Sequence, residues 1–270
     1  MRTSLLARPF AYVGVLHLLP LPAGPRASEG FGAARVRALA DADALVAGGA
    51  HAAILENFGD SPFPAGPVDP HVVAFVGALA SELRGRHPGL ALGINLLRND
   101  ARAAMGVAAA SGAAFVRVNV HVGAMVTDQG LLQGDAHGTL RYRRELAADV
   151  GIVADVLVKH AVPLGPADVG AVAADTFHRG GAEVLVVTGE GTGKAADPLR
   201  ARAVRAAVPS RAAGGPCLWV GSGVTLASAA QWRQEADGAI VGTALHHDGD
   251  VRAPLDTARV AAMGRALGVA

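Results

Sequence analysis

The chain has 270 residues, of which 24 are lysine or arginine and 23 are aspartate or glutamate, so its formal net charge is +1. This balance argues against nucleic-acid binding, for which a basic surface is typical. Hydrophobic residues make up 51% of the chain and charged residues 17%, a composition that excludes intrinsic disorder. The single cysteine, Cys217, can form no disulfide within the chain, which fits a reducing compartment. We therefore expect a cytoplasmic protein that binds no nucleic acid.

An apolar segment near the N-terminus, residues 11–22, raises the question of a membrane span or a signal peptide. A membrane-spanning helix needs about 20 apolar residues, so this segment is too short, and it contains His17, Pro20 and Pro22. No clean cleavage site of small residues follows it, as a signal peptide would require. The segment instead predicts a buried strand, and we expect no transmembrane segment.

Short apolar runs rich in β-branched residues alternate with alanine-rich stretches of helical length along the chain. Such continuously apolar runs are typical of parallel strands that are buried on both faces. Eight strands alternating with helices over about 250 residues predict an α/β protein with a single (β/α)8 TIM barrel, spanning residues 1–270. A doubly wound open sheet is the rival, but its Gly-x-Gly-x-x-Gly motif is missing after the early strands. The predicted strands are residues 12–18, 52–58, 90–97, 115–121, 151–158, 183–188, 217–220 and 238–241.

Polar side chains gather where the predicted strands end, and a TIM barrel has its active site at this carboxyl end. A barrel with a purely structural role would not need so many ionisable groups there. Glu56 follows Ala-Ile-Leu, an apolar setting that suits a general acid or base. We predict that the catalytic residues are His17, Glu56, Asn95, Asn119, His121, Asp155 and Lys159.

Lys159 is four residues after Asp155, so both side chains would face the same side if the fifth predicted strand continued that far. Pro163 indicates that the strand ends earlier, and we therefore expect Lys159 on the following loop. A lysine at a barrel mouth can form a Schiff base when desolvation lowers its pKa, or it can hold a carboxylate. The alternative is an ion pair with Asp155 or Glu56.

Glycine and hydroxyl residues follow the last two predicted strands. Barrels often build a phosphate site from these two loops, because glycine lets backbone N–H groups approach an anion and hydroxyl groups can donate to it. The alternative is a pair of tight turns whose small residues serve packing alone. We predict a barrel of the phosphate-binding type, whose site is formed by Gly221, Ser222, Gly223, Gly242 and Thr243.

Residues 188–194 form another glycine-rich loop, Thr-Gly-Glu-Gly-Thr-Gly-Lys. The Walker motif of nucleoside triphosphatases requires Gly-x-x-x-x-Gly-Lys-Ser/Thr. Here the spacing from Gly189 to Gly193 is one residue short, and Ala195 stands where serine or threonine is needed. We interpret the segment as a loop that closes over substrate, in which Gly191 and Lys194 contact the phosphate.

The segment of residues 122–134 exceeds the usual length of a loop. Long loops in compact domains are often lids or binding loops. We predict a lid whose residues Thr127, Asp128 and Gln129 reach the substrate, with an interface as the alternative.

A divalent metal could be held by imidazole and carboxylate groups at the predicted strand ends. No His-Glu-x-x-His or His-x-His spacing supports such a site, so we predict no metal site and no cofactor, with a divalent metal as the alternative. The histidines that do not end a predicted strand, among them His246, are expected to lie away from the mouth or on the surface. The candidate ligands are His17, Glu56, His121, Asp155 and His160.

Motifs at these strand ends resemble those of the BtpA family (BtpA/SgcQ), which is named after a photosystem I biogenesis factor. The resemblance runs from about residue 12 to residue 260, and it is specific because several distinctive motifs occur in order. The matching stretches are Gly-Val-Leu-His-Leu-Leu-Pro-Leu-Pro at 14–22, Glu-Asn-Phe-Gly-Asp-Ser-Pro-Phe at 56–63, Asn-Leu-Leu-Arg-Asn-Asp at 95–100, Arg-Val-Asn-Val-His at 117–121, Thr-Asp-Gln-Gly at 127–130, Asp-Val-Leu-Val-Lys-His-Ala at 155–161, Gly-Ser-Gly-Val at 221–224 and Val-Gly-Thr at 241–243.

The resemblance implies a TIM barrel of the phosphate-binding kind. One family member is implicated in the accumulation of photosystem I and is associated with photosynthetic membranes. Others accompany sugar-metabolism genes and have been labelled nucleoside triphosphatases, a label that the imperfect loop at residues 189–194 supports little. The family has no settled reaction, so the resemblance transfers no catalytic role to this chain.

We predict an enzyme that acts on a small phosphorylated metabolite, a sugar phosphate, by proton abstraction beside a carbonyl group. Such an enzyme would be an isomerase, an epimerase or an aldolase/lyase, with Glu56 and Asp155 as acid and base candidates. Lys159 would be the electrophile or Schiff-base former, while the asparagines and His121 orient hydroxyl groups. The alternative is a non-catalytic assembly or stability factor for a membrane protein complex, associated peripherally with the membrane. We expect a homo-oligomer, since many such barrels self-associate.

Overall fold

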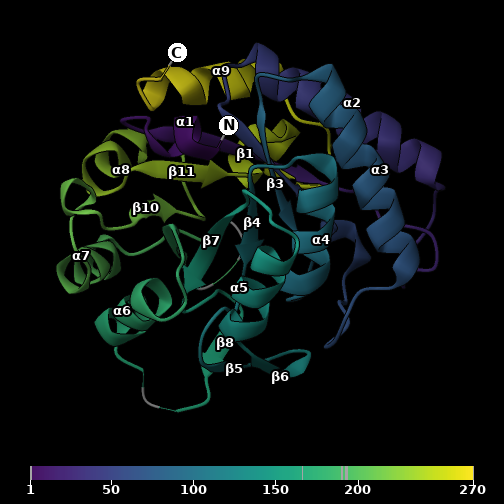
Figure 1. Cartoon of the computed structure of the whole chain (residues 1–270). Coiled ribbons are helices and arrows are strands. Elements are labelled where there is room, and N and C mark those ends of the chain that lie inside the picture. Colours follow the sequence, from purple (N-terminus) through teal and green to yellow (C-terminus); the bar gives the residue numbers. More distant parts are fainter. Residues whose placement is uncertain (1, 166, 190, 192–193, 270) are drawn as a thin grey trace.

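Eight parallel strands close into a barrel in the computed structural model of the chain, which describes residues 2–165, 167–189, 191 and 194–269 (Figure 1). Each barrel strand is hydrogen-bonded to the barrel strands before and after it in the chain, and the last one pairs with the first. This arrangement confirms the predicted (β/α)8 TIM barrel. The barrel strands are β1 (Ala11–His17), β2 (Ala52–Glu56), β3 (Ala91–Asn95), β4 (Phe115–Val118), β7 (Gly151–Val156), β9 (Val184–Val187), β10 (Cys217–Val220) and β11 (Gly238–Val241).

Helices surround the barrel and connect successive strands (Figure 1). Aspartate side chains cap several of them: Asp197 accepts a hydrogen bond from the backbone N–H of Leu199 at 2.8 Å, and Pro198 begins α7. None of the helices in the described ranges is long and apolar enough to cross a membrane. The helices are α1 (Arg2–Leu6), α2 (Phe31–Ala47), α3 (Pro70–Arg86), α4 (Ala101–Ser111), α5 (Ala136–Glu145), α6 (Val169–His178), α7 (Pro198–Ala207), α8 (Ala229–Glu235) and α9 (Thr257–Ala266), with 3-10 turns η1 (Phe58–Asp60), η2 (Arg211–Ala213), η3 (Thr243–Leu245) and η4 (His247–Gly249).

Side chains of the barrel strands alternate between the barrel interior and the layer beneath the helices, as the pleat of a strand requires. The interior is filled by apolar side chains that include Ile54, Phe115 and Trp219, and the last two rings meet edge to face with centroids 5.9 Å apart. Gly93 makes room for Phe115, because a Cβ at this position would lie 2.1 Å from the ring. Leu5 of α1 joins the same cluster. The barrel interior below the mouth is therefore packed mainly with apolar side chains.

A separate antiparallel sheet contains β5 (Ala124–Thr127), β6 (Gly130–Gln133) and β8 (Ala161–Pro163). β5 pairs with both other strands, so the segment after β4 is joined to the segment after β7. The prediction of a long loop at residues 122–134 was therefore wrong in its local structure: the segment forms a β-hairpin whose tip pairs Thr127 with Gly130. Its strands are short and find their third partner more than 30 residues away, which local periodicity cannot reveal.

Candidate active site

Three neighbouring strands direct polar side chains into the barrel mouth. The register places His17 at the end of β1 beside Glu56 of β2, and Glu56 beside Asn95 of β3. The amide Nδ2 of Asn95 donates a hydrogen bond to Oε2 of Glu56 at 2.6 Å, and both side chains are buried. This contact fixes the orientation of the Glu56 carboxylate.

Arg117 of β4 and Asp155 of β7 form a buried ion pair between neighbouring strands, beside the mouth. Nε and Nη2 of Arg117 donate to Oδ1 and Oδ2 of Asp155, each at 3.0 Å, and Nδ2 of Asn119 donates to Oδ2 at 3.1 Å. Arg117 is only 4% exposed. Asp155 therefore acts as a counterion that holds a bidentate guanidinium. Sequence reasoning did not select Arg117, although a charged residue two positions after the interior Phe115 is the signal that could have found it.

Lys159 lies on the connection between β7 and β8, as expected from the sequence. Burial lowers the pKa of its ammonium group, and the positive charge of Arg117 lowers this pKa further. In the described parts of the chain no carboxylate forms an ion pair with Lys159, and Asp155 is paired with Arg117 instead. Leu157 and His160 on either side of it both have a φ of 56°, a backbone conformation that costs energy in residues with a Cβ. A strained connection thus presents an amine with a lowered pKa.

Two adjoining cavities occupy the mouth and share a wall of Glu56, Arg117 and Lys159. The first, which we name the glycine cavity, has a volume of about 150 Å³ and is lined by His17 and by the loops after β10 and β11. The second, the arginine cavity, has a volume of about 380 Å³ and is lined by Arg98 after β3 and by other residues of the β1–β4 and β7 loops. The two cavities therefore meet at these three side chains, one of which is Lys159.

The loops after β10 and β11 line the glycine cavity with small residues, among them the predicted Gly221, Ser222, Gly223, Gly242 and Thr243. The Ser222 hydroxyl is engaged within the protein: it accepts a hydrogen bond from the N–H of Gly189 at 2.6 Å and donates one to the carbonyl of Lys194 at 3.1 Å. Gly223 has a φ of 66°, and a Cβ there would lie 2.3 Å from the Cα of Ala195. Ser222 and Gly223 thus fasten the loop after β9 to the barrel, and the Thr243 side chain is left to face a ligand.

Of the predicted phosphate loop at residues 188–194, Glu190, Thr192 and Gly193 lie outside the described residues. Lys194 is exposed, and neither cavity of the mouth is lined by it. A Cβ on Gly191 would lie 3.2 Å from the His160 ring and 3.6 Å from Cδ of Lys194, so this part of the loop lies beside the Lys159 connection. The contact of Gly191 and Lys194 with a phosphate stays a prediction.

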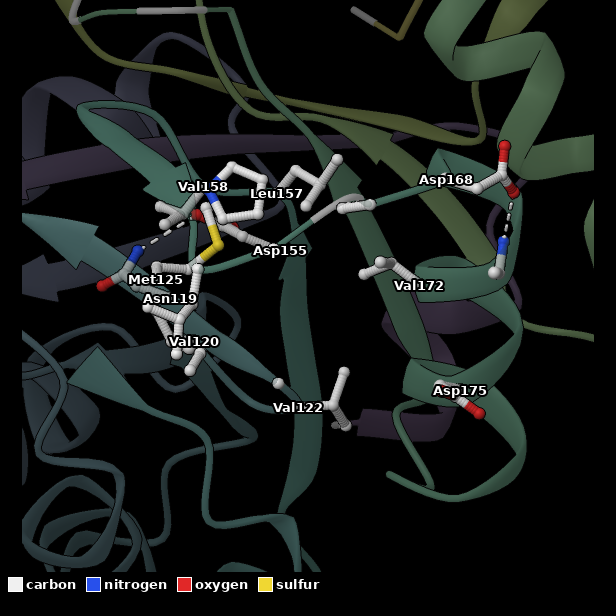
Figure 2. Close-up of a pocket in the computed structure, with 17 residues that line it drawn as sticks. Asn119, Val120, Val122, Met125, Asp155, Leu157, Val158, Asp168, Val172 and Asp175 are labelled. Carbon is white, nitrogen blue, oxygen red and sulfur yellow. Dashed lines mark hydrogen bonds between the residues drawn. The ribbon is translucent and has the colours of Figure 1, made fainter. Parts of the chain in front are cut away.

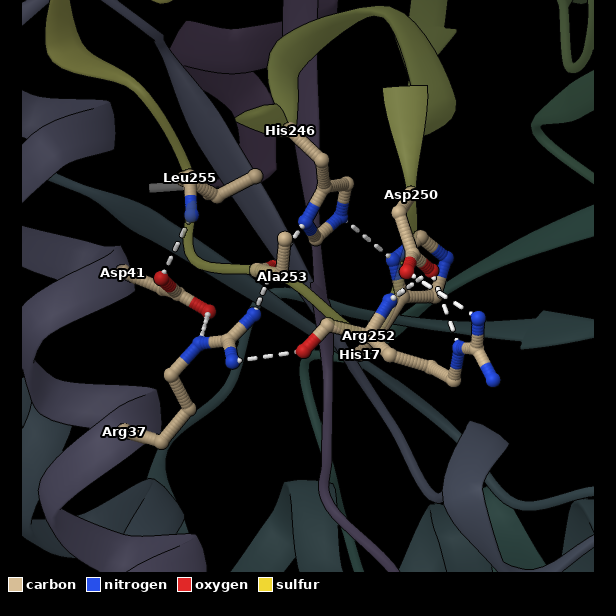
Figure 3. A network of polar contacts seen from close by, with 8 residues as sticks. All are labelled: His17, Arg37, Asp41, His246, Asp250, Arg252, Ala253 and Leu255. Atoms are coloured by element: carbon tan, nitrogen blue, oxygen red, sulfur yellow. Dashed lines mark hydrogen bonds and ion pairs between the residues drawn. The ribbon is translucent and has the colours of Figure 1, made fainter. Parts of the chain in front are cut away.

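His17 is part of a network that determines its tautomer (Figure 3). Nδ1 of His246 lies 2.6 Å from the carbonyl oxygen of Ala253, which can only accept, so His246 carries its proton on Nδ1. Nε2 of His246 must then accept from Nδ1 of His17, 3.0 Å away, which leaves Nε2 of His17 without a proton. A Cβ on Gly242 would lie 3.4 Å from this Nε2. Arg37 donates to the same Ala253 carbonyl and also to Asp41. The first of these contacts holds the segment around Ala253 against α2.

Burial lowers the pKa values of both histidines, and the neighbouring His246 lowers that of His17 further, so both rings are neutral at pH 7. His17 therefore presents a hydrogen-bond acceptor to the glycine cavity. The prediction that His246 lies away from the mouth was wrong: it is fully buried in direct contact with His17. It follows β11 through the 3-10 turn η3, and this turn brings it back to β1.

Two other predicted groups have different surroundings. His121 is buried away from both cavities of the mouth, where its Nε2 donates to the carbonyl of Gly180 at 2.8 Å, beyond the end of α6. At the tip of the β5–β6 hairpin, Asp128 lines the arginine cavity. Thr127 and Gln129 stabilise that tip, since the Thr127 hydroxyl accepts from the N–H of Gln129 at 3.2 Å. Asp128 is thus the residue of the hairpin that the structure places at the mouth.

A third cavity of about 570 Å³ opens between the small sheet and α6 (Figure 2). Its walls are mainly apolar and include Met125, Leu157 and Val172, while Asn119 and Asp155 separate it from the barrel mouth. The described residues contain no cluster of three or more histidine, cysteine or acidic side chains that could hold a metal ion. The groups suited to chemistry on a polar substrate are therefore those of the glycine and arginine cavities.

A closed barrel with polar groups at the carboxyl ends of its strands defines a TIM-barrel protein of the kind that carries a site in this mouth. Its sequence matches the BtpA family over residues 9–267, and the chain belongs to this family. It is 43% identical to the photosystem I biogenesis protein BtpA of Synechocystis sp. over 255 residues, which are 94% of this chain and 87% of the relative. An uncharacterized protein of Thermococcus kodakarensis is 38% identical, over 88% of each chain.

Solved structures of low sequence identity share the fold. Dihydropteroate synthase from Burkholderia cenocepacia superposes with a TM-score of 0.60 at 18% identity, over 97% of this chain and 90% of that one. N-(5'-phosphoribosyl)anthranilate isomerase from Pyrococcus furiosus superposes with a TM-score of 0.56 at 10% identity, over 97% of this chain and 100% of that one. These similarities establish the TIM-barrel architecture.

Proposed function

We propose that this BtpA-family barrel is an enzyme that acts on a small phosphorylated metabolite, a sugar phosphate, by proton abstraction beside a carbonyl group. The reaction would be of the isomerase, epimerase or aldolase/lyase class. The observation that carries the proposal is the placement of Lys159 and Glu56 in the wall shared by the glycine and arginine cavities. A substrate whose phosphate occupies the glycine cavity would bring its carbonyl carbon to this wall.

The glycine cavity supports the phosphate assignment through its backbone. In the described chain no hydrogen bond occupies the N–H groups of Gly223, Val224, Thr243 or Ala244, all of which line this cavity. Free N–H groups together with the Thr243 hydroxyl suit an anion with several oxygens. The neutral His17 adds an acceptor, which suits a substrate hydroxyl or a protonated phosphate oxygen beside it.

Lys159 and Glu56 divide the chemistry between them. Because the pKa of Lys159 is lowered by burial, more of its amine is neutral at pH 7 than in water, and the neutral amine adds to a carbonyl carbon. Loss of water then gives a protonated imine. Glu56, oriented by Asn95, takes the proton from the neighbouring carbon, and the imine accepts the electron pair that the C–H bond leaves.

The test is exchange of that proton with solvent. The wild-type protein is incubated in D2O with a panel of phosphorylated aldoses, ketoses and keto acids, and NMR follows the signal of the proton beside the carbonyl. We expect exchange with at least one compound, and a loss of at least about 100-fold in Glu56→Gln and Lys159→Met. Arg252→Gln, which changes a charge 85% exposed on the surface, serves as the matched control. Absence of exchange, together with no thermal stabilisation by any phosphorylated compound, would contradict the proposal.

A non-catalytic assembly role is the second candidate, favoured by the name of the Synechocystis relative, a photosystem I biogenesis protein. Under that role, with peripheral association at a membrane complex, the residues of the mouth would be dispensable. Glu56→Gln and Lys159→Met variants that fully restore the phenotype of a strain lacking this protein would favour assembly over catalysis. Loss of rescue by both variants, with normal protein levels, would favour the enzyme.

A further inference from the structure

Arg98 is a buried cation that forms no ion pair with any described carboxylate. It follows β3 at the carboxyl end of the barrel, lines the arginine cavity and is 5% exposed. Its Nη2 donates to the backbone carbonyl of Lys159 at 2.8 Å, and it has no ion pair within the described ranges. Burial lowers its pKa, as expected for a guanidinium whose desolvation the surrounding charges do not offset. A buried charge of this kind is costly unless a partner binds it.

One edge of the Arg98 guanidinium makes no hydrogen bond within the described residues. Arginine has five N–H hydrogens and two edges that can each hold a carboxylate through two parallel hydrogen bonds. The bond to Lys159 uses one Nη2 hydrogen and therefore blocks only one of these edges. The other edge remains able to bind a planar, two-oxygen anion.

The charges of the arginine cavity favour a singly charged partner. Arg117 is already neutralised by Asp155, and Arg26 is exposed, so solvent screens it. Glu56 and Asp128 line the same cavity and would repel a dianion. A carboxylate carries one negative charge and matches the free edge of Arg98, whereas a second phosphate would carry up to two charges and meet both acidic groups.

We propose that the arginine cavity binds a carboxylate of the substrate through Arg98, so that the substrate is a phosphorylated acid with anionic groups at opposite ends. Its phosphate occupies the glycine cavity, and its reacting carbon lies between them at Lys159 and Glu56. This inference rests on the proposed function, because it assigns the second half of the same ligand. It assigns Arg98 as the residue that determines the substrate class. Arg98 would distinguish phosphorylated acids from sugar phosphates of equal length that have an uncharged group at the far end.

The test compares ligands that differ only at the end remote from the phosphate. 6-Phosphogluconate and sorbitol 6-phosphate are the same six-carbon chain with a carboxylate or a hydroxymethyl group, and 3-phosphoglycerate and glycerol 3-phosphate form a shorter pair. Isothermal titration calorimetry of the wild-type protein should give at least about tenfold tighter binding of the acid in one of these pairs, as one charge-assisted contact predicts. Arg98→Gln should reduce the affinity ratio of acid to hydroxymethyl compound to about one, without weakening the binding of the hydroxymethyl compound.

The outcomes separate this inference from the proposal on which it rests. Equal affinity of the wild-type protein for the acids and for their hydroxymethyl counterparts overturns the carboxylate assignment but not the phosphate assignment. A preference that survives in Arg98→Gln and is lost in Arg26→Gln overturns the assignment to Arg98. Binding of no compound in either pair overturns both proposals. Arg98→Lys, which keeps the charge but not the two-point edge, should retain an intermediate ratio, and the retained binding of the hydroxymethyl compound verifies that the variants are folded.

Discussion

The ion pair between Arg117 and Asp155 allows the sharpest test of the site's energetics. In Asp155→Asn the carboxylate charge is lost while the shape is kept, and the guanidinium of Arg117, 4% exposed, is left without a counterion. Two opposite unit charges about 4 Å apart attract by roughly 4 kcal/mol at an effective dielectric constant near 20. Removal of one partner from a buried pair costs about 3–5 kcal/mol in other proteins. We expect a loss of this size, which is a large part of the total stability of about 5–15 kcal/mol typical of a domain.

The assay is urea unfolding followed by circular dichroism, with the free energy of unfolding extrapolated to water. Asp175→Asn is the matched control, since Asp175 and Arg179 are an exposed pair 4.0 Å apart, and such pairs contribute about 0–1 kcal/mol. The double variant Arg117→Met/Asp155→Leu should recover much of the loss, because it removes both buried charges together. A loss below about 1 kcal/mol in Asp155→Asn would refute the reasoning.

Three further predictions follow from other contacts. Burial holds the pKa values of His17 and His246 below the ordinary 6.5, so on acidification the unfolded chain takes up these two protons before the folded protein does. The free energy of unfolding should therefore fall as the pH drops below about 6.5, by up to ~1.4 kcal/mol per pH unit for each ring. His17→Gln/His246→Leu should flatten that slope in urea titrations at pH 7 and pH 5, and an unchanged slope would count against the neutral pair. Gly93→Ala should cost about 1–3 kcal/mol by unfolding, and Phe115→Leu added to it should restore part, because the new Cβ meets the ring. Thr243→Asp should abolish the thermal stabilisation by phosphate compounds, which is about 2.7 kcal/mol for the wild-type protein at a ligand concentration 100 times the dissociation constant. If the variant is still stabilised, the phosphate does not bind at Thr243.

The barrel could be predicted because each of its strands carries a local signal. The runs are continuously apolar and end in polar or glycine residues, and the observed bounds differ from the predicted ones by at most three residues at either end. The small sheet could not be predicted in the same way. Its strands are three or four residues long, and the pairing of β5 with β8 depends on how the connections after β4 and β7 meet in space.

The candidate site was predictable as far as strand ends determine it. His17, Glu56 and Asn95 end neighbouring strands, so the common register of a parallel barrel places them side by side. The position of His246 depends on a 3-10 turn after β11, and that of Arg98 on the turn after β3. No periodicity describes such turns, so these partners of the site emerge only from the three-dimensional structure.

The cations near the mouth are of two kinds, those with a carboxylate partner in the protein and those without one. Arg117 is paired with Asp155, whose Oδ2 also accepts from Asn119, and this set would be stable in a protein with no ligand at all. Lys159 is half-buried and Arg98 is buried, and both line the arginine cavity with no ion pair in the described chain. Burial lowers the pKa of each. A fold gains no stability from a cation in that state, since desolvation costs more than the distant carboxylates return. A charge without a partner in the protein suits a site whose ligand supplies that partner, and this argument supports our proposal that the substrate binds at Lys159 and Arg98 rather than at the Arg117 pair.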